Sequence, residues 1–332
     1  MADQKWVLAG DIGGTKTQLA LFAVEGERLR LEAPQRFLSK QYSGLVPVLH
    51  DYLTGTRPPL DAACFGIAGA VVDGKVTTPN LPWIVDAADV RRALQLEAVT
   101  LLNDLEAAAY GIFTLDDDEF ALLNHGTMRH AGNKAVIAAG TGLGQTMLYD
   151  DGHHFRPLAS EGGHGDFAPR NEIEIELLRH LIGRFGHVSY ERVVSGPGLV
   201  NIYRFLKEVR RMEEPAALRE KFAREDDRAA VISKAALAGE FEICVVALDL
   251  LVSVYGAEAG NLALRAKSVR GLYVGGGIAP KIIAKLQDGT FMRAFKDKGR
   301  YADFMAAIPV QVVLNEQAAL RGAAYHAAFL TR

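Results

Sequence analysis

Short apolar runs that end in glycine-rich turns recur along this chain, and helix-like stretches separate them. Residues 6–14 and 17–24 are predicted to form a hairpin, and residues 134–149 repeat the same order of strand, glycine turn and strand. Further buried strands are predicted at 65–70, 99–102 and 271–274. Helices are predicted at 105–110, 171–185, 197–212 and 317–330, with a charge-rich, solvated helical excursion at 207–228.

Alternation of strands and helices predicts an α/β fold. The repeat of the glycine-turn unit about 130 residues along the chain predicts a duplicated, two-lobed architecture rather than a short-period solenoid. A third glycine turn, 275–277, follows the strand predicted at 271–274. The pattern therefore places three glycine turns directly after apolar strands.

The first turn, GDIGGTKT, is close to a phosphate-binding P-loop but differs at one position, because Thr15 stands where that motif needs glycine before Lys16. A P-loop also opens a helix, whereas residues 18–22 have no polar helical face. We therefore expect a hairpin tip. Consecutive backbone N–H groups in such a tip can bind phosphate, since glycine allows the required backbone angles.

Composition narrows the class of protein. The 332 residues are 49% hydrophobic and 23% charged, with a net charge of −3, which gives no electrostatic reason to expect nucleic-acid binding. The only cysteines, Cys64 and Cys244, argue against a disulfide framework or a structural zinc. No signal peptide is apparent. The longest apolar stretch, 243–255, is too short for a membrane span and predicts a buried helix. A cytoplasmic globular protein is expected.

Asp11 and the pair Asn103-Asp104 are candidates for chemistry, since each follows a predicted strand. Asp11 could help bind Mg²⁺, directly or through water, or it could cap its own turn. Asp104 could accept a hydroxyl proton during phosphoryl transfer. Alternatively, Asn103 or Asp104 caps the following helix, and Glu106 has capping-box spacing from Asn103. The two roles are compatible.

The segment SEGGHGD, 160–166, carries Glu161 and His164 on glycine-rich backbone, where they could bind adjacent sugar hydroxyls. A Ser/His/Asp hydrolase is disfavoured because no nucleophile-elbow motif is present, and a metal site is disfavoured because no second His or Cys has ligand spacing. A solvated loop is the remaining alternative. Glu191, taken alone, is interpreted as a surface helix residue.

The ordered set of motifs resembles the bacterial ATP-dependent glucokinase family, from about residue 6 to the C-terminus. These motifs are GDIGGT at 10–15, LNDLEAAAYG at 102–111, AAGTGLG at 138–144, EGGHGDFAP at 161–169, ERVVSGPGLVNIY at 191–203 and GGGIAP at 275–280. The resemblance implies the two-domain fold of the hexokinase and actin-like ATPases, with an interdomain cleft. We expect a small domain of 1–112 plus about 316–332, and a large domain of 113–315.

The resemblance also implies residue roles. Asp104 is the implied base on the sugar 6-hydroxyl, and Asp11 is implied in Mg²⁺ binding. Lys16 receives no catalytic role. The implied sugar contacts are Asn103, Asp104, Glu161, His164 and Glu191, with Asn80 as a weaker candidate. The implied ATP contacts are Gly10, Asp11, Ile12, Gly13, Gly14, Thr15, Gly140, Thr141, Gly142, Gly144, Gly275, Gly276 and Gly277.

One departure separates neighbouring families. The related repressor–kinase (ROK) family carries a zinc-binding cysteine cluster soon after the histidine, whereas Phe167 to Asn171 follow here. The resemblance thus implies a zinc-free glucokinase of glycolysis that uses ATP and Mg²⁺ and forms a homodimer. Composition and hydropathy add the expectation of a cytoplasmic protein that binds neither nucleic acid nor membrane. A kinase for mannose, fructose or an N-acetylhexosamine, another phosphoryl donor, and a non-catalytic sugar sensor on the same fold are the alternatives.

Overall fold

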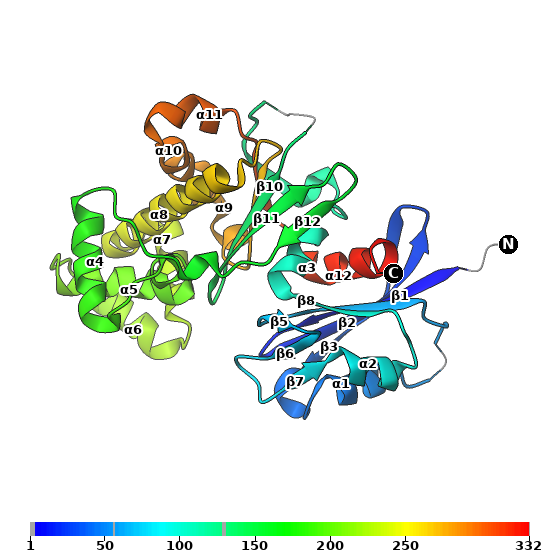
Figure 1. The fold of residues 1–332 in the computed structure, drawn as a ribbon. Coiled ribbons are helices and arrows are strands. Elements are labelled where there is room, and N and C mark those ends of the chain that lie inside the picture. The colour runs from blue at the N-terminus through cyan, green and yellow to red at the C-terminus, as the bar shows by residue number, and fades with distance from the viewer. Residues whose placement is uncertain (1–3, 56, 128–130, 332) are drawn as a thin grey trace. The chain divides into compact units, whose positions relative to one another are not determined.

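The computed structural model describes residues 4–55, 57–127 and 131–331, which form two compact units (Figure 1). Unit 1 consists of Met1–Glu119 and Asn315–Arg332, and unit 2 consists of Phe120–Leu314. A compact unit is not by itself an independently folding domain, so the domain boundaries expected from the sequence stay a prediction.

Unit 1 is built on a five-stranded sheet in the order β3-β2-β1-β4-β8, beside a small sheet of β5, β6 and β7. The strands β1, β4 and β8 are parallel, and β2 and β3 continue the sheet as antiparallel neighbours. Its elements are β1 (Lys5–Ile12), β2 (Lys16–Glu25), β3 (Arg28–Leu38), η1 (Ser39–Gln41), α1 (Leu45–Tyr52), β4 (Ala62–Ile67), β5 (Val71–Val72), β6 (Lys75–Thr77), β7 (Ile84–Asp86), α2 (Ala87–Leu94), β8 (Val99–Asn103), α3 (Asp104–Gly111), η2 (Asp117–Glu119) and α12 (Ala318–Phe329).

Both faces of this sheet are buried. Because side chains alternate along a strand, Val7 packs in the cluster with α3 and α12, whereas Leu8 packs in the cluster with α1 and α2 (Figure 1). Helices α3 and α12 approach closely through glycine: a Cβ on Gly322 would lie 1.8 Å from the Ala107 carbonyl oxygen. The small-residue helix predicted at 317–330 is therefore confirmed, and its small residues allow the close packing.

Unit 2 has a six-stranded sheet in the order β12-β11-β10-β13-β14-β9, whose first five strands repeat the arrangement of unit 1. The α/β class and the repeated hairpin predicted from the sequence are confirmed. Its elements are β9 (Phe120–Asn124), β10 (Lys134–Ala139), β11 (Leu143–Asp150), β12 (Phe155–Leu158), η3 (Gly162–His164), α4 (Glu172–Phe185), η4 (Tyr190–Arg192), α5 (Gly196–Glu208), α6 (Ala216–Arg224), α7 (Arg228–Leu237), α8 (Glu242–Ala266), β13 (Leu272–Gly275), η5 (Ala279–Ile282), α9 (Ile283–Gln287), α10 (Thr290–Lys296), η6 (Gly299–Tyr301), α11 (Ala302–Ala306) and β14 (Val310–Val313).

Helix α8 is the central helix of unit 2 and packs against β10, β11, α5, α7 and α10. The buried helix predicted at 243–255 is confirmed, but its expected length was wrong, because the helix runs for 25 residues to Ala266. Among the described residues it is the one helix long and apolar enough to cross a membrane by length and composition. Since 78% of its most apolar window is buried inside the structure, it is explained as a core helix.

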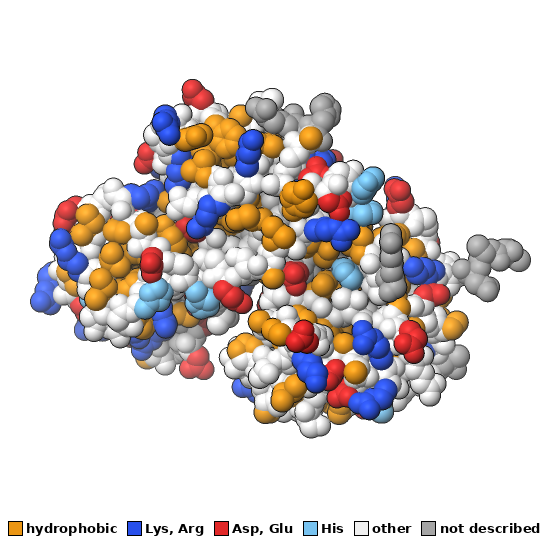
Figure 2. Space-filling view, viewed as in Figure 1, with side chains coloured by type: hydrophobic (Ala, Val, Ile, Leu, Met, Phe, Trp, Pro, Cys, Tyr) orange, Lys and Arg blue, Asp and Glu red, His pale blue; other side chains and the backbone are white. Residues whose placement is uncertain are grey.

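Two further differences from the sequence prediction concern polar segments. Helix α5 ends at Glu208 rather than at 212, and the charge-rich excursion contains the separate helix α6, which begins directly after Pro215. Proline lacks the N–H that a helix interior needs, so it starts the new helix instead. Over the face drawn in Figure 2, basic and acidic side chains are interspersed rather than gathered by sign.

Candidate active site

Three parallel strands of unit 1 end at the same edge of the sheet. In the register, Ile12 pairs with Ile67, and Ile67 pairs with Asn103, so β1, β4 and β8 finish side by side. The turn after β1 and the start of α3 at Asp104 therefore lie at this edge. The carboxyl ends of strands are where α/β proteins commonly bind ligands.

The turn between β1 and β2 is held by backbone and by one buried serine. Gly13 N donates to the Lys16 carbonyl (2.9 Å), and Ser39 donates from its Oγ to the Gly13 carbonyl (2.8 Å) and from its N–H to the Thr15 carbonyl (3.1 Å). Thr17 Oγ1 lies 3.0 Å from Ser39 Oγ. These carbonyls point inward to their donors. The sequence did not predict this role for Ser39, because Ser39 lies outside every glycine motif.

Asn80 packs against the tip of this turn, since a Cβ on Gly14 would lie 2.7 Å from the Asn80 Cβ. Thr15 and Asn80 are exposed, and Gly14 is half-buried. The turn therefore has an open side that presents backbone to solvent. The other predicted phosphate contacts of this segment, Gly10 and Ile12, are residues of β1 itself.

Asp11 is half-buried where β1 enters the turn, and it lies close enough to Asp104 to feel its charge. Burial, followed by repulsion from the Asp104 carboxylate, raises the pKa of Asp11 from 3.8 to about 6. Two carboxylates at one sheet edge create a negative potential that a cation would relieve. Among the described residues, no group of three His, Cys, Asp or Glu side chains forms a protein-only metal cage.

Asn103 caps α3, as one of the sequence alternatives proposed. Its Oδ1 accepts the Leu105 N–H (2.9 Å), and the Glu106 carboxylate accepts the Asn103 N–H (3.0 Å), which completes a capping box. Its Nδ2 donates to the Gly69 carbonyl (3.0 Å). Asp104 is exposed at the first position of the helix. Asn103 therefore provides the cap, and the exposed Asp104 accepts the same Leu105 N–H through its Oδ1 (2.9 Å).

Unit 2 brings its two glycine turns to one edge in the same way. Ala138 of β10 pairs with Gly275 of β13 in parallel register, so the turn 140–142 and the turn 276–277 are neighbours. Gly276 has φ +83 and lies so close to β10 that a Cβ would be 2.4 Å from the Ala139 carbonyl oxygen, which explains glycine there. Gly144 and Gly275 are strand residues of β11 and β13.

Helix α5 begins at this second edge. Gly196 N donates to the Gly140 carbonyl (2.9 Å), and Ser195 caps the helix through Gly198 N (3.0 Å). The helix N-terminus, with its partial positive charge, therefore lies at the turn that carries Thr141. This contact of α5 with a phosphate-type turn is a feature that the sequence analysis did not identify.

A cavity of about 1010 Å³ opens beside these turns, entirely within unit 2. Its walls are the turn at Gly140 and Thr141, the start of α5, the outer face of α7 and the segment from Gly277 to Ile282. The lining mixes leucine and isoleucine side chains with the polar residues Asp226, Asp227, Arg228, Ser233, Lys234 and Lys281. A cavity that combines apolar walls with a limited number of polar groups is typical of a small-molecule site.

The predicted sugar contacts of unit 2 lie in two short 3-10 segments. Glu161 and His164 are both exposed at η3, with 4.0 Å between a Glu161 Oε and the His164 Nε2. Glu191 is half-buried in η4, and its carboxylate accepts the N–H of Leu143 (3.0 Å). The interpretation of Glu191 as a surface helix residue is therefore wrong, because it is anchored to the backbone that follows the second glycine turn.

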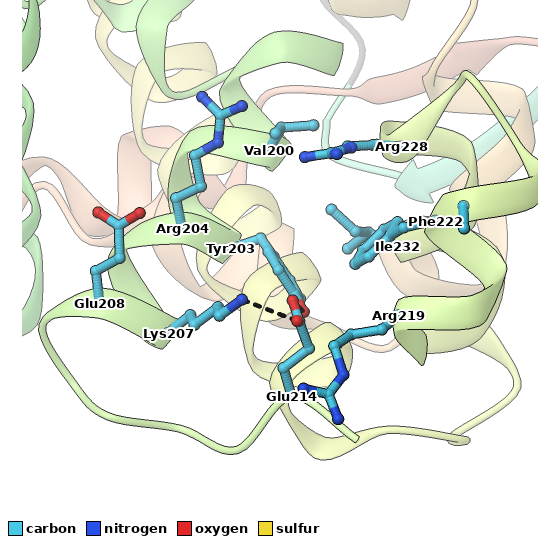
Figure 3. Close-up of a pocket in the computed structure, with 11 residues that line it drawn as sticks. Val200, Tyr203, Arg204, Lys207, Glu208, Glu214, Arg219, Phe222, Arg228 and Ile232 are labelled. Atoms are coloured by element: carbon cyan, nitrogen blue, oxygen red, sulfur yellow. Dashed lines mark hydrogen bonds and ion pairs between the residues drawn. The ribbon is translucent and has the colours of Figure 1, made fainter. Parts of the chain in front are cut away.

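A second, smaller hollow of about 360 Å³ lies among α5, α6 and α7 (Figure 3). Two carboxylates, Glu208 and Glu214, line it, and Glu214 accepts hydrogen bonds from Tyr203 Oη and Lys207 Nζ, each at 2.8 Å. The guanidinium of Arg228 lies 5.6 Å from the Phe222 ring, and Arg228 also lines the larger cavity. This network holds α6 against α5 and α7 and thereby shapes one wall of the larger cavity.

Comparison with known proteins identifies relatives along nearly the whole chain. The family model described as Glucokinase matches residues 8–329. A glucokinase of Nostoc sp. is 41% identical over 342 residues, covering 98% of this chain and 99% of that protein. The solved glucokinase from an Antarctic psychrotroph superimposes with a TM-score of 0.84 at 30% identity, covering 97% of this chain and 98% of the other.

A more distant relative shares the fold. A ROK family glucokinase from Streptomyces griseus, solved in complex with glucose and AMPPNP, has a TM-score of 0.66 at 23% identity and covers 97% of this chain and 99% of its own. At this identity the likeness concerns the fold alone. The two-domain actin-like ATPase fold expected from the sequence is confirmed by these neighbours.

Proposed function

This chain belongs to the glucokinase family, and we propose from that membership and from its site geometry that it transfers the γ-phosphoryl group of MgATP to the 6-hydroxyl of D-glucose. The products are glucose 6-phosphate and ADP. The observation that carries the proposal is the pairing of Asp104 with the first glycine turn at one strand edge, close enough for its charge to raise the pKa of Asp11.

Asp104 is proposed as the general base. Its carboxylate is exposed at the start of α3, while Asn103 performs the capping task. The O6–H bond of the sugar breaks as O6 attacks the γ-phosphorus, Asp104 accepts the proton, and the bond from the γ-phosphorus to the bridging oxygen breaks to release ADP. A positioned base of this kind contributes about 10²–10⁴-fold to the rate.

Asp11 is proposed to hold Mg²⁺, directly or through water. The fit rests on the negative potential that Asp11 and Asp104 share: burial, followed by repulsion from Asp104, raises the pKa of Asp11, and a cation there would offset the repulsion. Mg²⁺ commonly takes one or two carboxylates and completes its shell with water and phosphate oxygens, so a protein-only cage is not required. When bound, the ion neutralises charge on the transferred phosphoryl group.

The nucleotide is proposed to bind along the second and third turns. Thr141 and the glycines at 142, 276 and 277 are proposed to offer backbone N–H groups, whereas Gly140 N donates to the Gly142 carbonyl (2.8 Å) and Gly140 lines the cavity. The N-terminus of α5 adds a favourable dipole for phosphate. The cavity of about 1010 Å³ would take the adenosine between α7 and η5. The first turn, with Gly13, Gly14 and Thr15, is proposed as a second phosphate contact.

The sugar is proposed to contact Asn103, Asp104, Glu161, His164 and Glu191, with Asn80 as a further candidate. Carboxylates accept hydrogen bonds from hydroxyl groups, and imidazole can donate or accept. Two carboxylates and one imidazole from η3 and η4 therefore supply the pattern that adjacent sugar hydroxyls need.

A coupled assay for glucose 6-phosphate tests the proposal directly. Glucose, mannose, fructose and N-acetylglucosamine are compared by kcat/KM with MgATP and with other nucleoside triphosphates. Preference for glucose and ATP supports the proposal. Preference for another sugar or donor keeps the fold and the base but corrects the substrate. Sugar binding without turnover of any sugar would favour a non-catalytic sensor.

We also propose a cytoplasmic homodimer acting at the entry to glycolysis. The support is the family, together with a central apolar helix that the core of unit 2 accounts for. The helices between 205 and 265 are the first region to examine for the dimer contact. Analytical ultracentrifugation at micromolar concentration tests the oligomeric state.

A further inference from the structure

The carboxylate of Glu258 is fully buried in unit 2, on helix α8. Gln145 Nε2 donates to Oε1 at 2.9 Å, and Asn261 Nδ2 donates to Oε2 at 2.9 Å. The guanidinium of Arg265 pairs with the same carboxylate. A charge taken out of water is costly unless it is paired and hydrogen-bonded. The Glu258 carboxylate meets both conditions, since each of its oxygens accepts a hydrogen bond and Arg265 pairs with it.

The first of these partners supports the η3 turn. Gln145, on β11, lies directly beneath Gly162, because a Cβ there would be 2.9 Å from the Gln145 Oε1. Arg265 Nη2 lies 3.3 Å from that Oε1, so the amide has its oxygen towards Arg265 and its nitrogen towards Glu258. The orientation of the amide, and with it the surface on which η3 rests, is therefore set by Glu258 and Arg265.

The second partner reaches η4. Asn261 Nδ2 is also 3.1 Å from the Tyr190 Oη, and Tyr190 directly precedes Glu191. Burial, followed by the charge of Glu258, raises the pKa of Tyr190 to about 12, so the phenol stays protonated. Tyr190 N also donates to the Gly165 carbonyl (3.0 Å), which ties η4 to the end of η3.

We infer that Glu258 is a positioning residue for the sugar site, which rests on the function proposed above. Two amides that donate to this single carboxylate support the segments that carry the sugar ligands. Gln145 packs beneath Gly162 of η3, and Asn261 bonds Tyr190 of η4. Glu258 is too deeply buried to touch substrate. Its role is to fix the spacing of the sugar ligands on η3 and η4, so its loss would weaken sugar binding more than nucleotide binding.

The experiment replaces Glu258 by glutamine, which keeps the shape of the side chain. Glu174→Gln is the matched control: Glu174 is equally buried, and its carboxylate also pairs with one arginine, Arg170. That carboxylate accepts from Asn171 Nδ2 (3.3 Å) rather than from Gln145 or Asn261. We expect E258Q to raise the KM and the calorimetric Kd for glucose at least about tenfold, with the KM for ATP within about twofold. The control is expected to keep its KM for glucose.

Two milder variants keep the inference testable if E258Q does not fold. Gln145→Ala removes the side chain beneath η3, and Asn261→Ala removes the bond to η4. Each is expected to raise the KM for glucose, and a wild-type KM for glucose in both variants would overturn the inference. A wild-type KM for glucose in E258Q, or equal rises in E258Q and E174Q, overturns the inference. Wild-type protein that neither binds nor phosphorylates glucose would instead overturn the proposed function.

Discussion

Replacement of Asp104 by asparagine removes the proposed base while keeping the size of the side chain. We expect kcat to fall by about 10²–10⁴, which corresponds to about 2.7–5.4 kcal/mol of activation free energy at 1.36 kcal/mol per decade. The KM for ATP should change little, because Asp104 is assigned to the sugar hydroxyl.

The fold should tolerate this change. Asp104 is exposed, and its own Oδ1 accepts the Leu105 N–H (2.9 Å), but Asn103 Oδ1 bonds the same N–H and completes the capping box without it. Loss of a carboxylate from a helix first turn changes the free energy of unfolding by about 1 kcal/mol or less. Thermal unfolding should therefore show a small shift in Tm.

The same variant has an independent structural readout. Because the Asp104 charge contributes to the raised pKa of Asp11, after burial, D104N should lower the pKa of Asp11 below about 6. Carbon-detected NMR titration measures it. Asp89→Asn, another exposed first-turn carboxylate, in α2, serves as the control and should leave both kcat and the pKa of Asp11 unchanged. A D104N enzyme with kcat within about threefold of wild type would refute the assignment of the base.

Four further predictions test other parts of the site. Gly142→Ala should raise the KM for glucose in steady-state kinetics, because the new Cβ would lie 2.6 Å from the Glu191 Oε2 and displace that carboxylate. An unchanged KM for glucose would contradict the role of Glu191. Ser233→Trp should fill the α7 side of the cavity and raise the KM for ATP while calorimetric glucose binding persists; an unchanged KM for ATP removes the adenosine assignment. The pKa of Asp11 rises from 3.8 to about 6 on folding, so the Asp11 contribution to the free energy of unfolding should increase as pH falls from above 6 to 4, by up to about 3 kcal/mol. Because burial lowers the pKa of His326 to about 4 and acts in the opposite direction over this range, the test is the difference in unfolding free energy between wild type and Asp11→Asn in urea titrations; a difference that does not change with pH contradicts the assignment. Gly322→Ala should lower the free energy of unfolding by about 1–3 kcal/mol, because the new Cβ would overlap the Ala107 carbonyl oxygen. A Tm equal to that of wild type would show that α3 and α12 can separate at little cost.

The pattern of residues along the chain correctly predicts the α/β class, the two hairpins and the position of each glycine turn after its strand. These features are local: period-two apolar runs, glycine in turns and the Asn103–Glu106 spacing act over a few residues, and the structure contains the expected elements. The family followed from the order of six motifs, which the comparisons confirm. The roles of the site residues stay predictions.

Tertiary structure alone decided which distant residues support those motifs. Ser39 braces the first turn from 24 residues beyond Thr15, and Glu191 bonds the N–H of Leu143, yet neither pairing leaves a periodic signal. Glu258 lies within an apolar helix where a carboxylate gives no indication of its partners. Long-range hydrogen bonds depend on how strands and helices pack, whereas sequence patterns report only what each segment buries.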